Sequence, residues 1–317
     1  MLPLSHRPVW KRFRPIGTPE FRVRFVKYSL RFVNMRQLIP ILLYHSIAEN
    51  VAPDYRRWAV TPAAFAAQLA YLRQEGYHAL TVTELAHCLT TSPATLPTKP
   101  VVITFDDGLA DFYTGALPLL QDYGFPATLY ITTGYVEGKS RWLTAVGEGE
   151  RTMMSWAQIA ELPAHAIECG AHTHSHPQLD TLPRRQADYE IHHSKRLLEE
   201  KLGRPVTSFA YPHGYHDKAV QQMVRDAGFT AACGVKDAIS RPDDDRFGLA
   251  RIIVAGDTSL PHFANLLVGR GIALAPSYER LATKVWRLVR QRQADWRQHT
   301  DQTFVNPQGE TLSSFSW

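Results

Sequence analysis

The chain has 317 residues, of which 44% are hydrophobic and 21% are charged, and its formal net charge is +5. This composition is typical of a folded globular protein and excludes a low-complexity or strongly charged disordered chain. The three cysteines are few, odd in number and widely spaced, which excludes a disulfide framework and a CxxC metal site.

The positive charge is concentrated at the two ends of the chain. Residues 1–36 contain nine Lys or Arg and one acidic residue, whereas residues 37–275 have a net charge of −5. The basic isoelectric point is therefore no evidence for nucleic-acid binding, and we expect none. We predict a basic N-terminal extension over 1–36, one folded domain over 37–275, and a basic C-terminal helix and tail over 276–317.

Residues 1–36 contain no continuous apolar stretch of the kind found in a secretory signal. We expect a disordered arm, or a true start of the protein at Met35. The apolar run at 38–44 is too short to span a membrane and suits a buried strand. The expected location is therefore the cytoplasm, with weak contact between the basic termini and a membrane surface as an alternative.

From residue 38 onward, strand-like and helix-like segments alternate. The helix predicted over 61–76 has Thr61 as its N-cap, Pro62 at its first position and Gly76 at its end. Apolar and β-branched runs predict strands at 39–47, 77–81, 101–105, 126–132, 166–173, 206–212, 230–235 and 249–254. Further helices are predicted at 83–89, 109–123, 155–162, 184–203, 216–227 and 261–268. The alternation indicates an α/β fold with parallel strands, either barrel-like or doubly wound.

The C-terminal segment is predicted to form an amphipathic helix. Leu281, Val285 and Leu288 lie on one helical stripe with basic residues around it. We expect this helix to pack on the domain, with a membrane-surface helix as the alternative.

The strongest chemical signal is "VVITFDDGLAD" at 101–111, where a buried strand runs into Asp106 and Asp107. In parallel α/β folds, catalytic groups gather at the carboxyl ends of strands. Adjacent side chains of an extended segment point in opposite directions, so the two carboxylates can serve different purposes. The structural alternative is that Asp107 caps the next helix and Asp106 forms a salt bridge.

Three other predicted strands also end in polar residues. One ends at His45, another ends at the cluster "HTHSH", and a third ends at "PHG", residues 212–214. Within the cluster, His172, His174 and His176 would share one face of a strand, and Pro177 disfavours a helix there. Histidine is the commonest metal ligand, but the cluster alone leaves open which of the three bind a metal.

Taken in order, "TFDDG", "HTHSH", "FAYPHG" and "LARIIV" resemble the polysaccharide deacetylase family, also called the NodB-homology group or carbohydrate esterase family 4. The resemblance extends over about residues 40–255. "LLYHSI" together with "FAYPHG" resembles the branch that acts on bacterial exopolysaccharides rich in N-acetylglucosamine. The resemblance implies a distorted (β/α) barrel of about seven parallel strands, with 37–275 as a single catalytic domain. It implies a hydrolase that removes N-acetyl, or O-acetyl, groups from N-acetylhexosamine-containing poly- or oligosaccharides.

The resemblance also implies roles for individual residues. Asp106 would be the general base, and Asp107, His172 and His176 would bind one divalent metal ion. Zinc is the expected ion, with cobalt, nickel, manganese and iron as alternatives. His174 would be a bystander to this site.

Two family positions differ in this chain. The last motif contains Arg251 where many relatives have a catalytic histidine, so the general acid is expected to be His45, as in the branch resembled. Many relatives have an arginine where Ala210 stands, and that arginine pairs with the base aspartate. Arg251 is a candidate replacement for it.

Substrate contacts are expected around "FAYPHG". The backbone N–H near His213 would bind the oxyanion, and Tyr211, Pro212 and Arg251 complete the candidate oxyanion and substrate residues. The rings of Tyr211, Tyr215 and Trp58 are candidates for stacking on a sugar or, equally, for packing in the core.

Two alternative functions are open. A barrel amidohydrolase acting on another amide would use a His-x-His pair, either His172 with His174 or His174 with His176. That class expects the pair on an early strand, whereas here the aspartates come first. The second alternative is a carbohydrate-binding pseudoenzyme that retains the fold.

Overall fold

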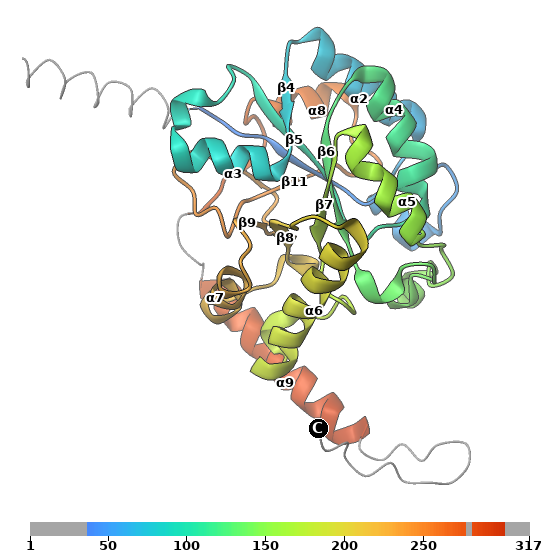
Figure 1. Ribbon diagram of the computed structural model, residues 1–317, viewed down its shortest axis with the longest axis vertical. Coiled ribbons are helices and arrows are strands. Elements are labelled where there is room, and N and C mark those ends of the chain that lie inside the picture. The colour runs from blue at the N-terminus through green and yellow to red at the C-terminus, as the bar shows by residue number, and fades with distance from the viewer. Residues whose placement is uncertain (1–36, 277–280, 302–317) are drawn as a thin grey trace, which may run out of the picture.

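The computed structural model describes residues 37–276 and 281–301 (Figure 1). The predicted N-terminal extension over 1–36 lies outside the described residues, as do 277–280 and 302–317. The predicted domain over 37–275 falls within the described part, and the predicted C-terminal helix is described from residue 281.

A curved parallel sheet forms the centre of the domain, and the predicted α/β barrel is confirmed. Seven strands follow one another in the order β11-β1-β5-β6-β7-β8-β9, and β4 pairs with the first half of β5. Every one of these pairings is parallel. The strands are β1 (Ile41–Tyr44), β4 (His78–Leu80), β5 (Pro100–Phe105), β6 (Ala127–Ile131), β7 (Ile167–Ala171), β8 (Ser208–Ala210), β9 (Ala231–Cys233) and β11 (Ile252–Ile253).

The segment 249–253 connects the two ends of this sheet. On one side the N–H of Leu249 donates to the carbonyl of Ala232 (3.0 Å), and the N–H of Gly234 donates back to Leu249 (2.8 Å). On the other side Ile252, in β11, pairs with Leu42 in β1. The last strand therefore bridges β9 and β1, which lie far apart in the sequence.

Helices surround the sheet (Figure 1). They are α2 (Pro62–Gln74), α3 (Val82–Thr91), α4 (Leu117–Tyr123), α5 (Trp156–Glu161), α6 (Arg184–Leu202), α7 (Lys218–Asp226) and α8 (Leu260–Leu267). As predicted, α2 begins with Thr61, whose side chain accepts from the N–H of Ala64, and the chain turns at Gly76 with a φ of 71°. Two short parallel pairs lie beside the main sheet, β2 (Ser46–Ile47) with β3 (Ala59–Val60) and β10 (Ala238–Ile239) with β12 (Ala273–Leu274).

The helix predicted over 109–123 is divided in two. A π-helical turn over Phe112–Ala116 precedes α4. Pro118 lies in the first turn of α4 and has no N–H with which to continue a regular helix from the preceding turn, so the hydrogen-bond pattern changes there.

The core lies on both faces of the sheet, because the strands are apolar at successive positions. Leu42, Phe105, Leu129 and Phe209 are fully buried. Burying each such side chain contributes about 1.5–3 kcal/mol. This pattern is typical of parallel strands covered on both faces, and it holds their carboxyl ends in fixed positions.

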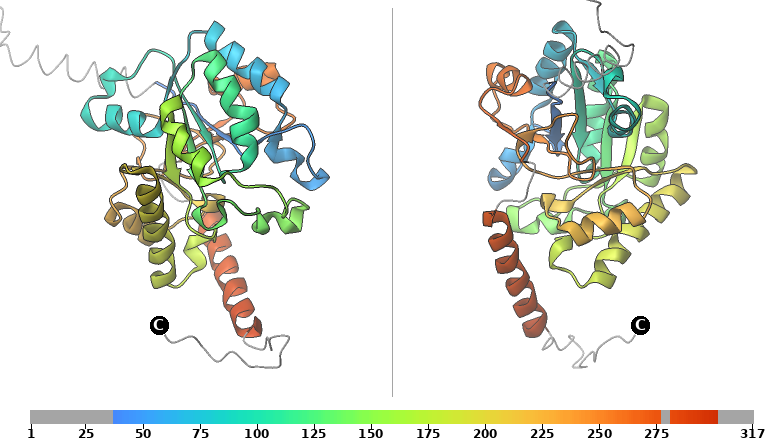
Figure 2. Two further views of the ribbon diagram at one scale, coloured as in Figure 1. Left: turned by 45° about the vertical axis from the view of Figure 1, so that its right-hand side comes forward. Right: turned by 90° about the vertical axis from the view of Figure 1, so that its left-hand side faces the viewer.

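Helix α9 (Leu281–Asp301) contacts the domain, but not through the predicted apolar stripe (Figure 2). Val285 and Leu288 are 59% and 60% exposed. Arg290 instead donates from both terminal guanidinium nitrogens to the buried carboxylate of Asp180. The helix therefore packs on the domain as expected, but it does so through arginine side chains on the face opposite the apolar stripe, which bind the buried carboxylate of Asp180.

None of the helices in the described part of the chain has both the length and the apolar character needed to cross a bilayer.

Candidate active site

The carboxyl ends of four parallel strands bring the predicted polar residues to one end of the barrel. Asp106 and Asp107 follow β5, and His45 follows β1. His172 follows β7, and His213 follows β8 after two residues. In the sheet order β1 is next to β5 and β7 is next to β8, with β6 between the two pairs, and the curvature of the sheet lets the side chains converge.

Asp106 and Asp107 face the same centre, and the expectation that they point in opposite directions is wrong. His172 Nε2 lies 3.8 Å from Asp106 Oδ2 and 3.7 Å from Asp107 Oδ1. The reason is that the strand has already ended: Asp107 has a φ of 78°, in the left-handed region, and Gly108 follows with a φ of 83°. This turn directs the second carboxylate to the same side as the first.

Asp107, His172 and His176 form a group that fits a divalent metal ion. Their ligand atoms all lie within 4.8 Å of one another, with His176 Nε2 3.4 Å from Asp107 Oδ1. The Nδ1 of His172 lies 2.8 Å from the carbonyl oxygen of Ala210, which directs Nε2 toward the centre. Asp107 Oδ1 is buried and has no hydrogen-bond partner among the described residues. A buried, unpartnered carboxylate oxygen beside two imidazoles is the donor set that zinc-type ions accept.

The turn between the two histidines is built by hydrogen bonds to its backbone. The hydroxyl of Thr173 accepts from the N–H of His176 (3.1 Å). The carboxylate of Glu190 accepts from the N–H groups of His174 and Ser175, each at 2.8 Å. Thr173 and His176 have φ values of 65° and 60°. Positive φ at such residues costs about 1–3 kcal/mol each, and these bonds offset part of that cost.

His174 lies outside the metal group. Its Nδ1 is 3.0 Å from the hydroxyl of Thr133, and its ring packs edge-on against His193 with 4.6 Å between centroids. The structure therefore brings together the first and third histidines of the cluster and directs the second away from them.

Arg251 pairs with Asp106 through two parallel hydrogen bonds. The distances are 2.6 Å to Oδ1 and 2.7 Å to Oδ2, and Arg251 Nε donates to the carbonyl of Gly234. Both side chains are buried. Burial raises the pKa of Asp106, but the charges of Arg251 and His172 outweigh it, so this pKa lies below its usual value. The carboxylate therefore stays ionised and fixed in orientation.

His45 is half-buried and packs against Trp58, with 4.8 Å between ring centroids. Burial lowers the pKa of His45, and the charges of Asp107 and Asp106 oppose this effect. The imidazole is thus within electrostatic range of both carboxylates. No side-chain hydrogen bond to an acidic residue holds it among the contacts of residues 37–276.

His213 completes the centre from the β8 side. Its ring lies 4.8 Å from that of His176, and its φ of 56° is again in the left-handed region. Burial and the neighbouring His176 lower the pKa of His213 to about 3. Tyr211 and Pro212 are buried, and the Tyr211 hydroxyl donates to the carbonyl of Phe247 (3.0 Å). For Tyr211 the core-packing alternative therefore applies, and its ring does not face a substrate.

Several residues at the site were not found from the sequence. The ring of Trp142 stacks on His176 with 5.1 Å between centroids. The hydroxyl of Tyr55 is buried without a partner, and Asp111 and Arg151 form a hydrogen-bonded ion pair nearby, with Arg151 over the Tyr55 ring. These residues come from loops or follow the strand end by several positions, so strand-end reasoning gives no signal for them.

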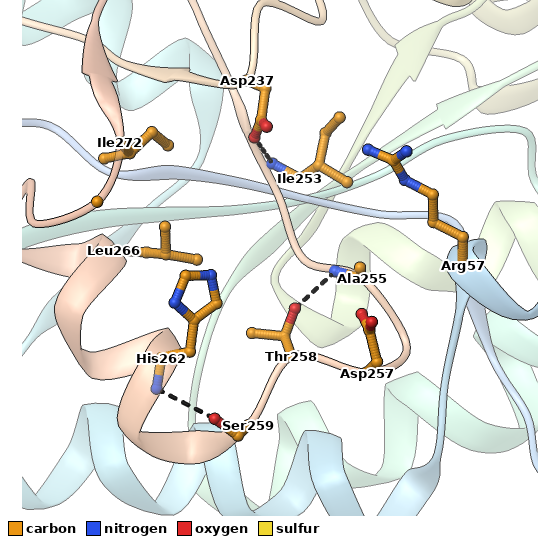
Figure 3. Close-up of a pocket in the computed structure, with 11 residues that line it drawn as sticks. Arg57, Asp237, Ile253, Ala255, Asp257, Thr258, Ser259, His262, Leu266 and Ile272 are labelled. Atoms are coloured by element: carbon orange, nitrogen blue, oxygen red, sulfur yellow. Dashed lines mark hydrogen bonds between the residues drawn. The ribbon is translucent and has the colours of Figure 1, made fainter.

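A pocket of about 350 Å³ lies beside the centre, at the carboxyl end of β11 (Figure 3). Arg57, Asp257 and His262 contribute polar groups to its lining. The guanidinium of Arg57 lies over the ring of Trp58, which contacts His45 on its other side. The pocket is lined by none of the predicted catalytic or metal-binding residues and is separate from the metal group.

A parallel barrel with a buried carboxylate and an Asp-His-His group at its strand ends defines the class of barrel hydrolases. Residues 94–232 match the family model for polysaccharide deacetylases. The solved structure of the deacetylase PplD from Streptococcus pyogenes, in complex with acetate, superimposes with a TM-score of 0.63 at 27% identity. The superposition covers 76% of this chain and 99% of the PplD chain.

Curated relatives agree with this match. YxkH of Bacillus subtilis, named for this family, is 29% identical over 68% of this chain and 71% of its own length. The poly-β-1,6-N-acetyl-D-glucosamine N-deacetylase of Escherichia coli is 31% identical over 41% of this chain, but only 20% of that protein is covered. The chain is thus similar to polysaccharide deacetylases, and the family model matches its central part, residues 94–232.

Proposed function

We propose that the protein is a metal-dependent deacetylase that hydrolyses N-acetyl groups of N-acetylhexosamine-containing poly- or oligosaccharides. The observation that supports this most strongly is the placement of the buried Asp106–Arg251 pair directly beside Asp107, His172 and His176. The name of the Escherichia coli relative favours poly-N-acetylglucosamine as the substrate class.

Asp106 is the general base in this proposal. It is ionised at neutral pH because Arg251 holds its pKa low, and Arg251 fixes both oxygens in place. A divalent ion, zinc first among the first-row candidates, would acidify a water molecule and polarise the acetyl carbonyl when bound by Asp107, His172 and His176. Asp106 is beside this position, with Oδ2 3.8 Å from His172 Nε2, and takes the proton of the attacking water.

His45 is the general acid that protonates the departing amine. It lies at the end of β1, next to β5, and the charges of both aspartates offset part of the effect of burial, which lowers the pKa of His45. The backbone N–H of His213 would donate to the oxyanion, and the left-handed backbone at this residue, in the loop after β8, supports this role. The rings around the centre exclude water from the reacting bond.

The proposal is tested by acetate release from N-acetylglucosamine oligomers, with and without a chelator. We expect release with the metal-loaded protein and loss of release with the chelator. His176→Ala should lose both bound metal and activity, whereas His174→Ala should retain metal, because His174 points to Thr133.

Equal metal loss in the two histidine variants would support a His-x-His amidohydrolase site instead. A metal-loaded protein that releases no acetate from any N-acetylated or O-acetylated saccharide would contradict the proposal.

A further inference from the structure

The polar face of helix α9 contacts the domain. Arg290 forms its two hydrogen bonds to Asp180 at 2.7 Å each, and its guanidinium carbon lies 3.6 Å from the ring centroid of Tyr215. Arg287 Nε also donates to Asp180 (3.2 Å), and Gln291 donates to the carbonyl of Asp180 (2.8 Å). These contacts fix which way the helix is rotated about its own axis.

The opposite face of α9 is apolar and exposed. Besides Val285 and Leu288, Val289 is 38% exposed. Trp286 lies at the edge of this face and is 49% exposed, while its Nε1 donates to the hydroxyl of Tyr215 (3.3 Å). Val285, Leu288, Val289 and Arg292 follow the i, i+3, i+4, i+7 spacing that places residues on one face of a helix. Lys284 and Arg292 are exposed as well. A helix docked on a soluble domain ordinarily buries its apolar stripe, and α9 does the reverse.

We infer that this face, formed by Lys284, Val285, Trp286, Leu288, Val289 and Arg292, binds the surface of an anionic lipid bilayer. Apolar side chains with a tryptophan and flanking cations are the features of helices that lie in the membrane interface. The long side chains of Lys284 and Arg292 can reach lipid phosphates while their methylene groups stay with the apolar residues.

The charge of the face argues against two other occupants. A second copy of α9 would bring like charges together, and one helical face falls short of the roughly 20–30 residues per partner that stable interfaces bury. The chain's own segment 1–36 has a net charge of +8, so the cations of the face repel it. The same segment gives the protein a second cationic element for an anionic surface, and stable membrane attachment usually needs two such signals.

Binding through this face would bring the active-site end of the barrel close to the membrane. Helix α9 docks on Asp180, in the turn that follows His176, and on Tyr215, which follows His213. The inference itself does not depend on the proposed deacetylation.

Vesicle co-sedimentation of the full chain tests this inference. We expect binding to phosphatidylcholine vesicles that contain phosphatidylglycerol, and little binding to pure phosphatidylcholine. The double variant Val285→Asn/Leu288→Gln should bind the anionic vesicles roughly tenfold or more weakly, because two apolar side chains are lost. Acetate release from a soluble oligosaccharide should be unchanged in this variant.

Val268→Asn is the matched control, because Val268 is 50% exposed on the domain itself, and it should bind like the wild type. Lys284→Gln/Arg292→Gln should bind more weakly and with less dependence on salt. Undiminished vesicle binding by the apolar double variant would overturn the inference and assign any binding to another part of the chain. Dimerisation of the wild type that the same variant abolishes would also overturn it, in favour of a second copy.

Discussion

Residues 37–276 and 281–301 contain two buried, bidentate arginine–aspartate pairs, Arg251–Asp106 and Arg290–Asp180, and only one of them lies at the candidate active site. The distances are nearly the same. Asp180, however, accepts from Arg287 as well, so its Oδ2 has two donors. Asp106 instead faces His172 and is followed by Asp107, which has an unpartnered oxygen. An ion pair is therefore structural when every acceptor is satisfied, and becomes reactive when acceptors beside it are left for water or a metal.

Substitution of each aspartate tests most directly whether the two ion pairs differ in function. Asp106→Asn should lower kcat by roughly 10²–10⁴-fold, because the general base is lost. Bound metal should be unchanged, since the three ligands remain. Asp180→Asn should lower kcat far less. Acetate-release kinetics with metal analysis measure both effects, and equal losses of kcat would show that the two pairs do not differ as described.

The two arginines should differ in their effect on stability. Arg251→Met leaves the carboxylate of Asp106 buried without a countercharge and should lower the free energy of unfolding by about 3–5 kcal/mol. Arg290→Met should cost only about 1–3 kcal/mol, because Asp180 keeps Arg287. Urea unfolding measures both values. Asp106→Asn in the Arg251→Met background should restore part of the loss, and a failure to do so would contradict the electrostatic explanation.

The region where α9 docks on the domain should make the stability of the fold sensitive to acid. His216, whose carbonyl accepts from Arg287, is half-buried, and its partial burial together with the nearby charge of Lys236 lowers its pKa to about 4. The folded state therefore binds fewer protons than the unfolded chain, and stability is complete above about pH 6.5 and falls progressively toward pH 4. His216→Phe should remove at most about 3 kcal/mol of this fall. Unfolding curves at a series of pH values measure it, and an unchanged slope would rule out His216 as a contributor.

The smallest effect is expected at the turn that holds His176. Thr173→Val removes the hydroxyl that accepts from the His176 N–H and should weaken metal binding by roughly 10–100-fold. Thr173→Ser keeps the hydroxyl and should bind metal like the wild type. Competition with a chelator measures the affinity. Equal affinities for the valine and serine variants would mean that the turn is held in other ways.

The barrel and the order of the polar residues at the strand ends could be predicted from the sequence, because apolar runs and the residues that follow them are local patterns. It was insufficient for two orientations. Asp107 turns toward Asp106 because its backbone is in the left-handed region, and the neighbouring residues do not predict this conformation. The rotation of helix α9 is set by the buried Asp180, which lies 110 residues away in the chain, so periodicity alone could not predict which face contacts the domain.

The Arg251–Asp106 pair could be named only as a candidate for a similar reason. The two residues are 145 positions apart, and only the bridging of β9 and β1 by segment 249–253 places them in contact. Loop residues such as Trp142 and Tyr55 reach the site through packing that no spacing encodes.

The position of Arg251 directly before β11, late in the chain, also affects the order in which the protein becomes active during synthesis. Asp106, Asp107 and the two histidines proposed to bind a metal, His172 and His176, leave the ribosome well before residue 251 does. Until then, Asp106 lacks the countercharge of Arg251 and the barrel is not bridged. On the proposed function, a nascent or truncated chain that ends before residue 249 would contain every proposed metal ligand and still be unable to hydrolyse an acetyl group. Enzymatic competence is in this way tied to completion of the barrel.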